Sequence, residues 1–76
     1  MLQDRGRLNE AEFFFEKALE VYPDDRAANR RFGLFLKQIG ETKRARAQLK
    51  RALEVDPDDV KVLWALAELG EDDDDD

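Results

Sequence analysis

Hydrophobic positions along this chain recur every three or four residues in four stretches, and short polar breaks separate the stretches. That spacing places hydrophobic side chains on one face of a helix, so it predicts four amphipathic helices. We expect these helices over residues 9–22, 26–39, 41–55 and 59–69. The side chains expected to face the core are Ala11, Phe15, Ala18 and Leu19, then Phe32, Phe35, Leu36 and Ile39, then Ala45, Leu49, Ala52 and Leu53, then Val62, Leu63, Leu66 and Leu69. Gly33 is expected on the inner face of the second helix as a point of close contact. Because the connections are short, neighbouring helices should run antiparallel.

The breaks between the stretches carry residues that end or begin helices. Pro23 and Pro57 follow the first and third stretches, and proline disfavours helical backbone at the residue before it. Asp24 or Asp25 can cap the second helix with a side-chain oxygen, and Gly40 stands where a helix end favours a left-handed residue. Each predicted helix is therefore bounded by an ordinary start or stop signal.

The chain also repeats itself at a spacing of 34 residues. Residues 2–25 align with residues 36–59, and ten of the 24 aligned pairs are identical. The identical pairs are Leu2/Leu36, Gly6/Gly40, Ala11/Ala45, Ala18/Ala52, Leu19/Leu53, Glu20/Glu54, Val21/Val55, Pro23/Pro57, Asp24/Asp58 and Asp25/Asp59. A fixed period of this size is typical of stacked helical units, each of which buries its apolar face only against its neighbours.

One set of residues within this period matches a known pattern. The set consists of Ala11, Phe15, Ala18 and Pro23, the second copies Ala45, Leu49, Ala52 and Pro57, and Phe32, Gly33 and Leu36 of the second helix. With these residues the chain resembles the tetratricopeptide repeat, a helix–turn–helix unit of 34 residues. Asn29 departs from the pattern, because the family has a large residue there. The half-TPR motif of RNA-processing scaffolds is a weaker resemblance, over residues 32–53.

The resemblance implies an all-α helix–turn–helix repeat solenoid of about two units and four antiparallel helices. It starts out of phase, because residues 9–22 match the second helix of a unit. We expect residues 1–70 to form this domain, and residues 71–76, with five consecutive aspartates, to form a disordered acidic tail.

The out-of-phase start leaves the first helix without its usual partner, and this helix carries Phe13 and Phe14 next to the expected core residue Phe15. Exposed aromatic side chains often mark a contact surface. Three interpretations follow: the chain is part of a longer array, it self-associates through Phe13 and Phe14, or it docks another protein there. In a fourth, the two rings pack on Leu2 and Leu8.

The composition excludes the usual catalytic constellations. The chain has no His, Cys or Ser, so it lacks a conventional nucleophile and the common neutral-pH proton shuttle. Thr42 sits at a helix start, where capping is its ordinary role. The glycines are isolated, and residues 56–59 lack the alternating ligand spacing of a calcium loop. We therefore predict no enzyme activity, no cofactor and no metal site.

The resemblance instead implies a non-enzymatic protein–protein interaction or scaffold module. In this family the first helices of the units line a concave groove, which accepts an extended peptide or a partner helix. On the matching face the sequence has Arg30, Leu34, Lys37, Gln38, Lys61, Trp64 and Glu68. Trp64 is the main candidate, because buried aromatic side chains dominate interface energies. The alternative is that Trp64 packs on the neighbouring helix.

Charge adds a second candidate surface. The net charge is -6, but residues 1–25 carry -4, residues 26–51 carry +8 and residues 52–76 carry -10. The candidate basic patch consists of Lys43, Arg44, Arg46, Lys50 and Arg51. Such a stripe can neutralise phosphates, which makes an RNA-associated scaffold the alternative function. The acidic flanks and the lack of an aromatic stacking platform favour a solvated helix face, and opposite charge blocks are also compatible with a homodimer.

The sequence shows no membrane or secretion signal. No apolar run approaches the roughly 18 residues that a bilayer span needs, and no apolar segment follows the N-terminal residues. We expect an intracellular setting by default, and a protein or peptide partner rather than a membrane.

Overall fold

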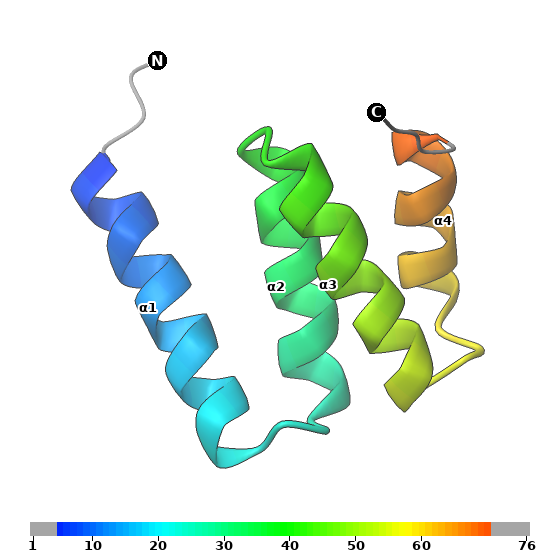
Figure 1. Ribbon diagram of the computed structural model, residues 1–76, viewed down its shortest axis with the longest axis horizontal. Helices are drawn as coiled ribbons and strands as arrows, with labels where there is room; N and C mark the ends of the chain where they lie inside the picture. The colour runs from blue at the N-terminus through cyan, green and yellow to red at the C-terminus, as the bar shows by residue number, and fades with distance from the viewer. Residues whose placement is uncertain (1–4, 71–76) are drawn as a thin grey trace.

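The computed structural model describes residues 5–70, which form four helices. The helices are α1 (Arg5–Val21), α2 (Arg26–Gln38), α3 (Thr42–Val55) and α4 (Val60–Leu69). Figure 1 shows them side by side in a row, with consecutive helices running in opposite directions and α1 and α4 at the two ends. Within these residues the predicted all-α helical-repeat fold is confirmed. The predicted acidic tail, residues 71–76, lies outside the described residues.

The helix boundaries differ from the prediction mainly at the start of α1. This helix begins at Arg5 rather than at residue 9, because half-buried Leu8 continues the apolar spacing that leads to Phe15. The other boundaries agree within one residue: Ile39 forms the C-cap of α2, and Asp59 is the N-cap of α4 rather than its first residue. Small shifts of this kind are ordinary at helix ends.

Two aspartates cap the helices that begin each unit. Asp25 accepts a hydrogen bond from the backbone N–H of Ala28 at 3.1 Å, and Asp59 accepts from Lys61 and Val62 at 3.1 and 3.4 Å. These bonds satisfy N–H groups that the first turn of a helix leaves without partners. The spacing of 34 between the two caps fixes where α2 and α4 begin.

The turn between α2 and α3 uses glycine rather than a side-chain cap. Gly40 has φ of +88°, the left-handed backbone predicted for it. Glu41 occupies the N-cap position of α3 without a side-chain cap bond, and Thr42 is the first helical residue. The capping role expected for Thr42 is therefore wrong, since Thr42 is itself the first helical residue and Glu41 precedes it as the N-cap.

The core forms along α2 and α3. One cluster consists of the buried residues Phe32, Leu36 and Ala45, and the other of Leu49, Ala52, Val62 and Ala65. Gly33 lets α2 and α3 approach closely beside Leu49, as its place on the inner stripe predicted. Leu63, also predicted to face the core, is 46% exposed, because no helix formed by residues 5–70 covers that side of α4.

Candidate functional site

The face predicted to bind a partner lies where α2 and α4 run next to each other. We call it the α2–α4 face and define it by Arg30, Leu34, Lys37, Gln38, Lys61, Trp64 and Glu68. The four α2 positions recur at intervals of four, three and one, and the three α4 positions at three and four, so each set lies along one side of its helix. The structure therefore places the predicted residues on one shared surface.

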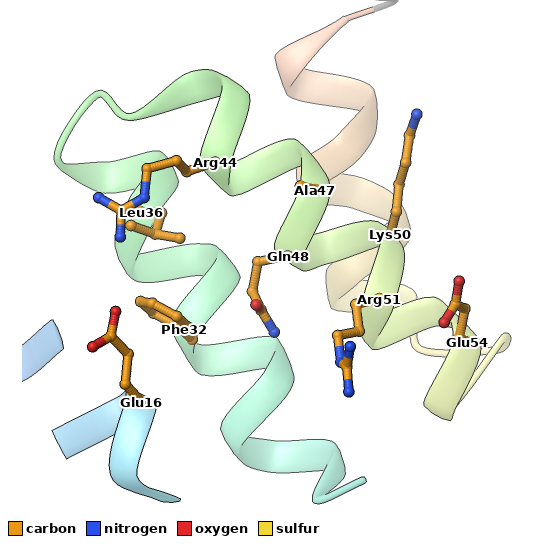
Figure 2. A pocket seen from close by; sticks show the side chains of 9 residues that line it. All are labelled: Glu16, Phe32, Leu36, Arg44, Ala47, Gln48, Lys50, Arg51 and Glu54. Carbon is orange, nitrogen blue, oxygen red and sulfur yellow. The ribbon is translucent and has the colours of Figure 1, made fainter. Parts of the chain in front are cut away.

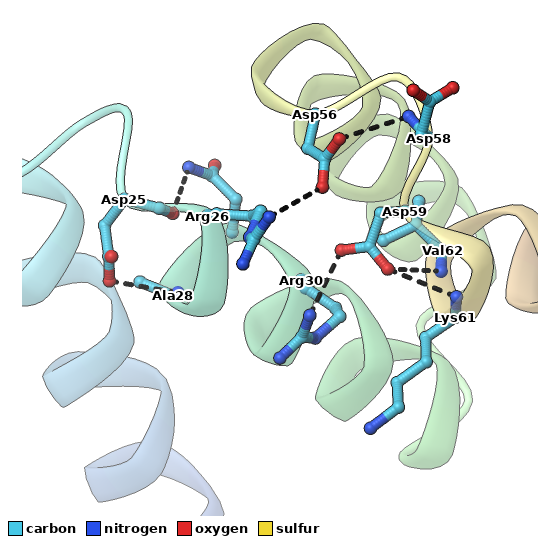
Figure 3. Close-up of polar contacts among 10 residues, drawn as sticks. Asp25, Arg26, Ala28, Arg30, Asp56, Asp58, Asp59, Lys61 and Val62 are labelled. Atoms are coloured by element: carbon cyan, nitrogen blue, oxygen red, sulfur yellow. Dashed lines mark hydrogen bonds and ion pairs between the residues drawn. The ribbon is translucent and has the colours of Figure 1, made fainter.

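Two ion pairs connect α2 to α4 across this face. Arg30 Nη1 lies 3.2 Å from Asp59 Oδ2, and Lys37 Nζ lies 2.7 Å from Glu68 Oε1. In Figure 3, one carboxylate oxygen of Asp59 accepts a hydrogen bond from Arg30, and the other accepts from the backbone N–H groups of Lys61 and Val62 at the start of α4. Two of the three cations predicted to meet a partner are thus already paired within the chain.

The Lys37–Glu68 pair also fixes the protonation state of its acid. The hydrogen bond and the charge of Lys37 lower the pKa of Glu68, and a hydrogen bond with Trp64 lowers it further. A glutamate is already a carboxylate at neutral pH, and the lowered pKa extends to lower pH the range in which Glu68 pairs with Lys37. Trp64, one helical turn before Glu68, has its polar edge turned toward the same carboxylate.

The remaining groups on the face are open to a partner. Trp64 is 68% exposed, so the interpretation that it packs on the neighbouring helix is wrong for most of its surface. Gln38 and Lys61 are exposed too, and the structure gives the Lys61 ammonium no ion-pair partner within residues 5–70. Leu34 is half-buried and packs against the core below. The face therefore offers one large aromatic surface, one unpaired cation and one amide.

A second exposed aromatic surface lies on α1. Phe13 and Phe14 are 52% and 66% exposed, and their rings meet edge to face at 5.6 Å. Phe15 instead turns inward and stacks on Phe32 at 5.4 Å, as predicted for the core position. The alternative in which both exposed rings pack on Leu2 and Leu8 involves Leu2, which lies outside the described residues. Their exposure shows that Leu8 does not cover them.

Two members of the predicted basic patch already have partners within the described residues. Arg44 pairs with Glu12 of α1, and this hydrogen bond raises the pKa of the guanidinium. Arg46 donates to the Leu69 carbonyl at the end of α4, at 3.4 Å. Lys43, Lys50 and Arg51 stay exposed. Three of the five cations therefore remain exposed without an ion-pair partner within residues 5–70.

An open cleft of about 500 Å³ lies between α1 and α3. Figure 2 shows Phe32 and Leu36 of α2 between side chains of α1 and α3. The lining residues are Glu16, Phe32, Leu36, Arg44, Ala47, Gln48, Lys50, Arg51 and Glu54. Because acids and bases alternate around it, the cleft does not favour a ligand of one charge.

Residues 5–70 contain no group of three or more acidic, His or Cys residues placed to hold a metal ion. None of the helices that these residues form has both the length and the apolar character needed to cross a membrane.

Asn29 is the residue whose role sequence reasoning missed. It is fully buried, and its side-chain amide donates to the carbonyls of Pro23 and Asp25 at 3.0 and 2.9 Å. Its oxygen accepts from the Gln48 amide at 2.7 Å. A polar side chain here replaces the family's large residue because it joins the α1–α2 turn to α3. The signal was its spacing from Phe32, which places Asn29 on the inner face of α2.

Comparison with known proteins agrees with this architecture. A family model described as Tetratricopeptide repeat matches residues 2–69. The Protein CTR9 homolog of Arabidopsis thaliana is 36% identical over 64 residues, which are 84% of this chain and 6% of that protein. The chain therefore spans only a small part of this relative's length. No solved structure matches the chain.

Proposed function

Because this chain belongs to the tetratricopeptide repeat family, whose stacked repeats present binding surfaces to other proteins, we propose that it is a non-catalytic module that binds a peptide or partner helix on the α2–α4 face. The observation that carries the proposal is the 68% exposure of Trp64 on that face. Large aromatic side chains are costly to leave in water and contribute strongly when an interface covers them.

The charges on the face narrow the chemistry of the partner. Arg30 and Lys37 are paired with α4 carboxylates, so a partner must displace those acids before it can use either cation. Lys61 has no such competitor within the described residues and lies on the same helix as Trp64, one turn earlier. We therefore expect a segment with an apolar side chain over Trp64 and a carboxylate near Lys61.

The test uses the chain's single tryptophan as a reporter. Peptides are selected from a displayed random library on the wild-type chain, and their binding is measured from the shift in Trp64 emission and by calorimetry. Trp64→Ala should weaken the selected peptides by about tenfold or more while leaving helicity unchanged. Phe13→Ala is the matched control, since Phe13 is also an exposed aromatic residue but lies on α1. Equal binding by wild type and Trp64→Ala would overturn the assignment.

The RNA-associated scaffold stays the weaker candidate, because two of the five cations that suggest it already have partners within the chain, Arg44 on Glu12 and Arg46 on the Leu69 carbonyl. Its test is binding to a mixed RNA pool at increasing salt. Salt-sensitive binding that disappears when Lys43, Arg44 and Arg46 are neutralised would support it in place of the peptide-binding proposal.

A further inference from the structure

The large exposed hydrophobic side chains gather at the two ends of the helix row. They are Phe13, Phe14, Val21, Tyr22, Val60, Leu63 and Trp64. All seven lie on α1, on the residue that follows it, or on α4, and none lies on the central helices α2 and α3. Exposed apolar surface on a small chain of high charge marks a contact site.

The 34-residue repeat provides a template for what could cover these ends. Positions in α1 correspond to positions in α3, and positions in α2 to positions in α4. α3 packs between α2 and α4, whereas α1 packs against α2 alone among the described helices. Accordingly Ala45 and Ala52 of α3 are 0% and 1% exposed, while their equivalents Ala11 and Ala18 are only half-buried. The side of α1 that no described helix covers is therefore equivalent, in the repeat, to the side of α3 that packs against α2.

The contact between α2 and α3 predicts which end residues would meet. Inside the chain, Gln48 of α3 donates to Asn29 of α2 at 2.7 Å. The residue 34 positions before Gln48 is Phe14, and the residue 34 positions after Asn29 is Leu63. These two are 66% and 46% exposed. A partly buried polar pair in the middle of the row thus corresponds to an apolar pair divided between its two open ends.

A second internal contact shows the same replacement. Arg26 at the start of α2 pairs with Asp56 after α3, at 3.1 Å. The equivalent residues at the ends are Val60 and Tyr22, which are 72% and 68% exposed. Both polar partners are again replaced by apolar side chains.

Charge is complementary at a further equivalent position, whereas size is not. Gly33 against Leu49 corresponds to Ala67 against Phe15, so the α1 helix of a second copy has to lie slightly farther from α4 than α3 lies from α2. The Glu12–Arg44 ion pair between α1 and α3 corresponds to Glu10 of α1 and Arg46 of α3. These last two carry opposite charges, so the template brings no like charges together there.

One internal contact has no apolar replacement. The Arg30–Asp59 pair corresponds to Trp64 and Asp25, which are neither oppositely charged nor both apolar. The complementary part of the two ends is therefore centred on Leu63 and Phe14, beside the α2–α4 face.

We propose that a second copy of this chain docks head to tail, with the exposed side of its α1 against the exposed side of α4. The arrangement is the one that α3 has on α2. In it, Leu63 contacts Phe14 of the second copy and Val60 contacts Tyr22 of the second copy. The contact joins two different surfaces, so each copy keeps one free end and association is open-ended rather than limited to a closed pair. The contact is centred on Leu63, beside the peptide-binding face, and the template places Trp64 of that face opposite Asp25 of the second copy. The variants at Phe14 and Leu63 test the docking without changing Trp64.

Adjacent phenylalanines supply a matched test of the template. Phe14 corresponds to Gln48, which contacts Asn29 of α2 inside the chain. Phe13 corresponds to Ala47, which is exposed within the chain. Light scattering and sedimentation are measured up to roughly 1 mM, since contacts smaller than about 1,200 Å² are weak. Phe14→Asp should lower the association constant at least tenfold, and Phe13→Asp should change it less than twofold. A wild type that stays monomeric, or equal loss in both variants, would overturn the proposal.

Mixing separates head-to-tail docking from other kinds of association and from misfolding. Phe14→Asp keeps an intact α4 end, and Leu63→Asp keeps an intact α1 end. Each variant alone should be monomeric and helical by circular dichroism, and an equimolar mixture should form dimers and nothing larger. A mixture that stays monomeric, or a single variant that still dimerises, would exclude the proposed contact. Peptide binding is measured at dilute concentration, where copies are separate, so the two proposals are tested apart.

Discussion

Gly33 of α2 faces Leu49 of α3 so closely that a Cβ atom on residue 33 would lie 2.5 Å from Leu49 Cδ2. The same atom would lie 2.7 Å from Leu49 Cγ and 3.3 Å from the backbone nitrogen. Leu49 is fully buried, so its side chain has no space into which to move. The distance between the two central helices is therefore set by the absence of a side chain at residue 33.

Gly33→Ala should destabilise the chain by about 1 kcal/mol or more. Alanine gains about 1 kcal/mol in helix propensity. A contact as short as 2.5 Å against a fully buried neighbour should cost about 2–3 kcal/mol, the upper part of the usual range for overpacking. Urea unfolding followed by circular dichroism measures the net effect. In a Leu49→Ala background the obstruction is gone, and the same Gly33→Ala change should become stabilising. No change of sign between the two backgrounds would contradict the steric explanation.

Asn29→Leu should cost about 2–4 kcal/mol, although leucine is closer to the family pattern. The change removes the donor to the Pro23 carbonyl and one of the two donors to the Asp25 carbonyl, which keeps the backbone N–H of residue 29. It also leaves the Gln48 amide facing an apolar group. Adding Gln48→Leu should recover part of the loss, since replacing both polar partners is less costly than replacing one. Denaturant midpoints of the four chains in the cycle measure this coupling. A stabilised Asn29→Leu chain would show that the buried amide is dispensable.

Asp59→Ala should cost about 1–3 kcal/mol, whereas Asp58→Ala should stay within about 0.5 kcal/mol. Asp59 caps α4 and pairs with Arg30, while the carboxylate of Asp58 is exposed and forms neither contact. Asp59→Asn keeps a good cap without the negative charge, so it separates the two contributions. Thermal unfolding of the three variants is the measurement, and equal effects at residues 58 and 59 would contradict this assignment.

The stabilising contribution of Glu68 should disappear in acid. Lys37 lowers the pKa of Glu68 in the folded chain, so the pair stabilises the fold above the ordinary glutamate pKa. This contribution is lost as the pH falls through the lowered value. Glu68→Gln should therefore be less stable than wild type at about pH 7 and equal to it at about pH 2. A difference that persists unchanged in acid would mean that the pair does not act through the carboxylate charge.

Sequence periodicity predicted the number, type and order of the helices, because apolar spacing and capping residues act locally. It also predicted Gly33 as a close contact and Phe15 as a core residue. The ion pairs from Arg30 to Asp59 and from Lys37 to Glu68 were not predicted, since each joins residues about thirty positions apart. Which cations stay free for a partner depends on those pairings, and only the folded arrangement of the helices determines them.

Asn29 shows a different kind of gap between pattern and structure. A family pattern classifies the residue as a departure, and polarity alone suggests an exposed position. Neither considers that the turn leaves the carbonyl of Pro23 in need of a donor, whereas the Asp25 carbonyl already accepts the backbone N–H of residue 29. Counting unsatisfied backbone groups in the turn would have indicated the role of Asn29.

The double role of Asp59 determines where the chain can tolerate a change of length. A residue inserted before Asp59 lengthens the turn and leaves both the cap and the Arg30 pair in place. A residue inserted just after it rotates the rest of α4 by about 100°, which turns Val62 out of the core. Insertions and deletions during evolution should therefore accumulate at residues 56–58 and stop abruptly at Asp59.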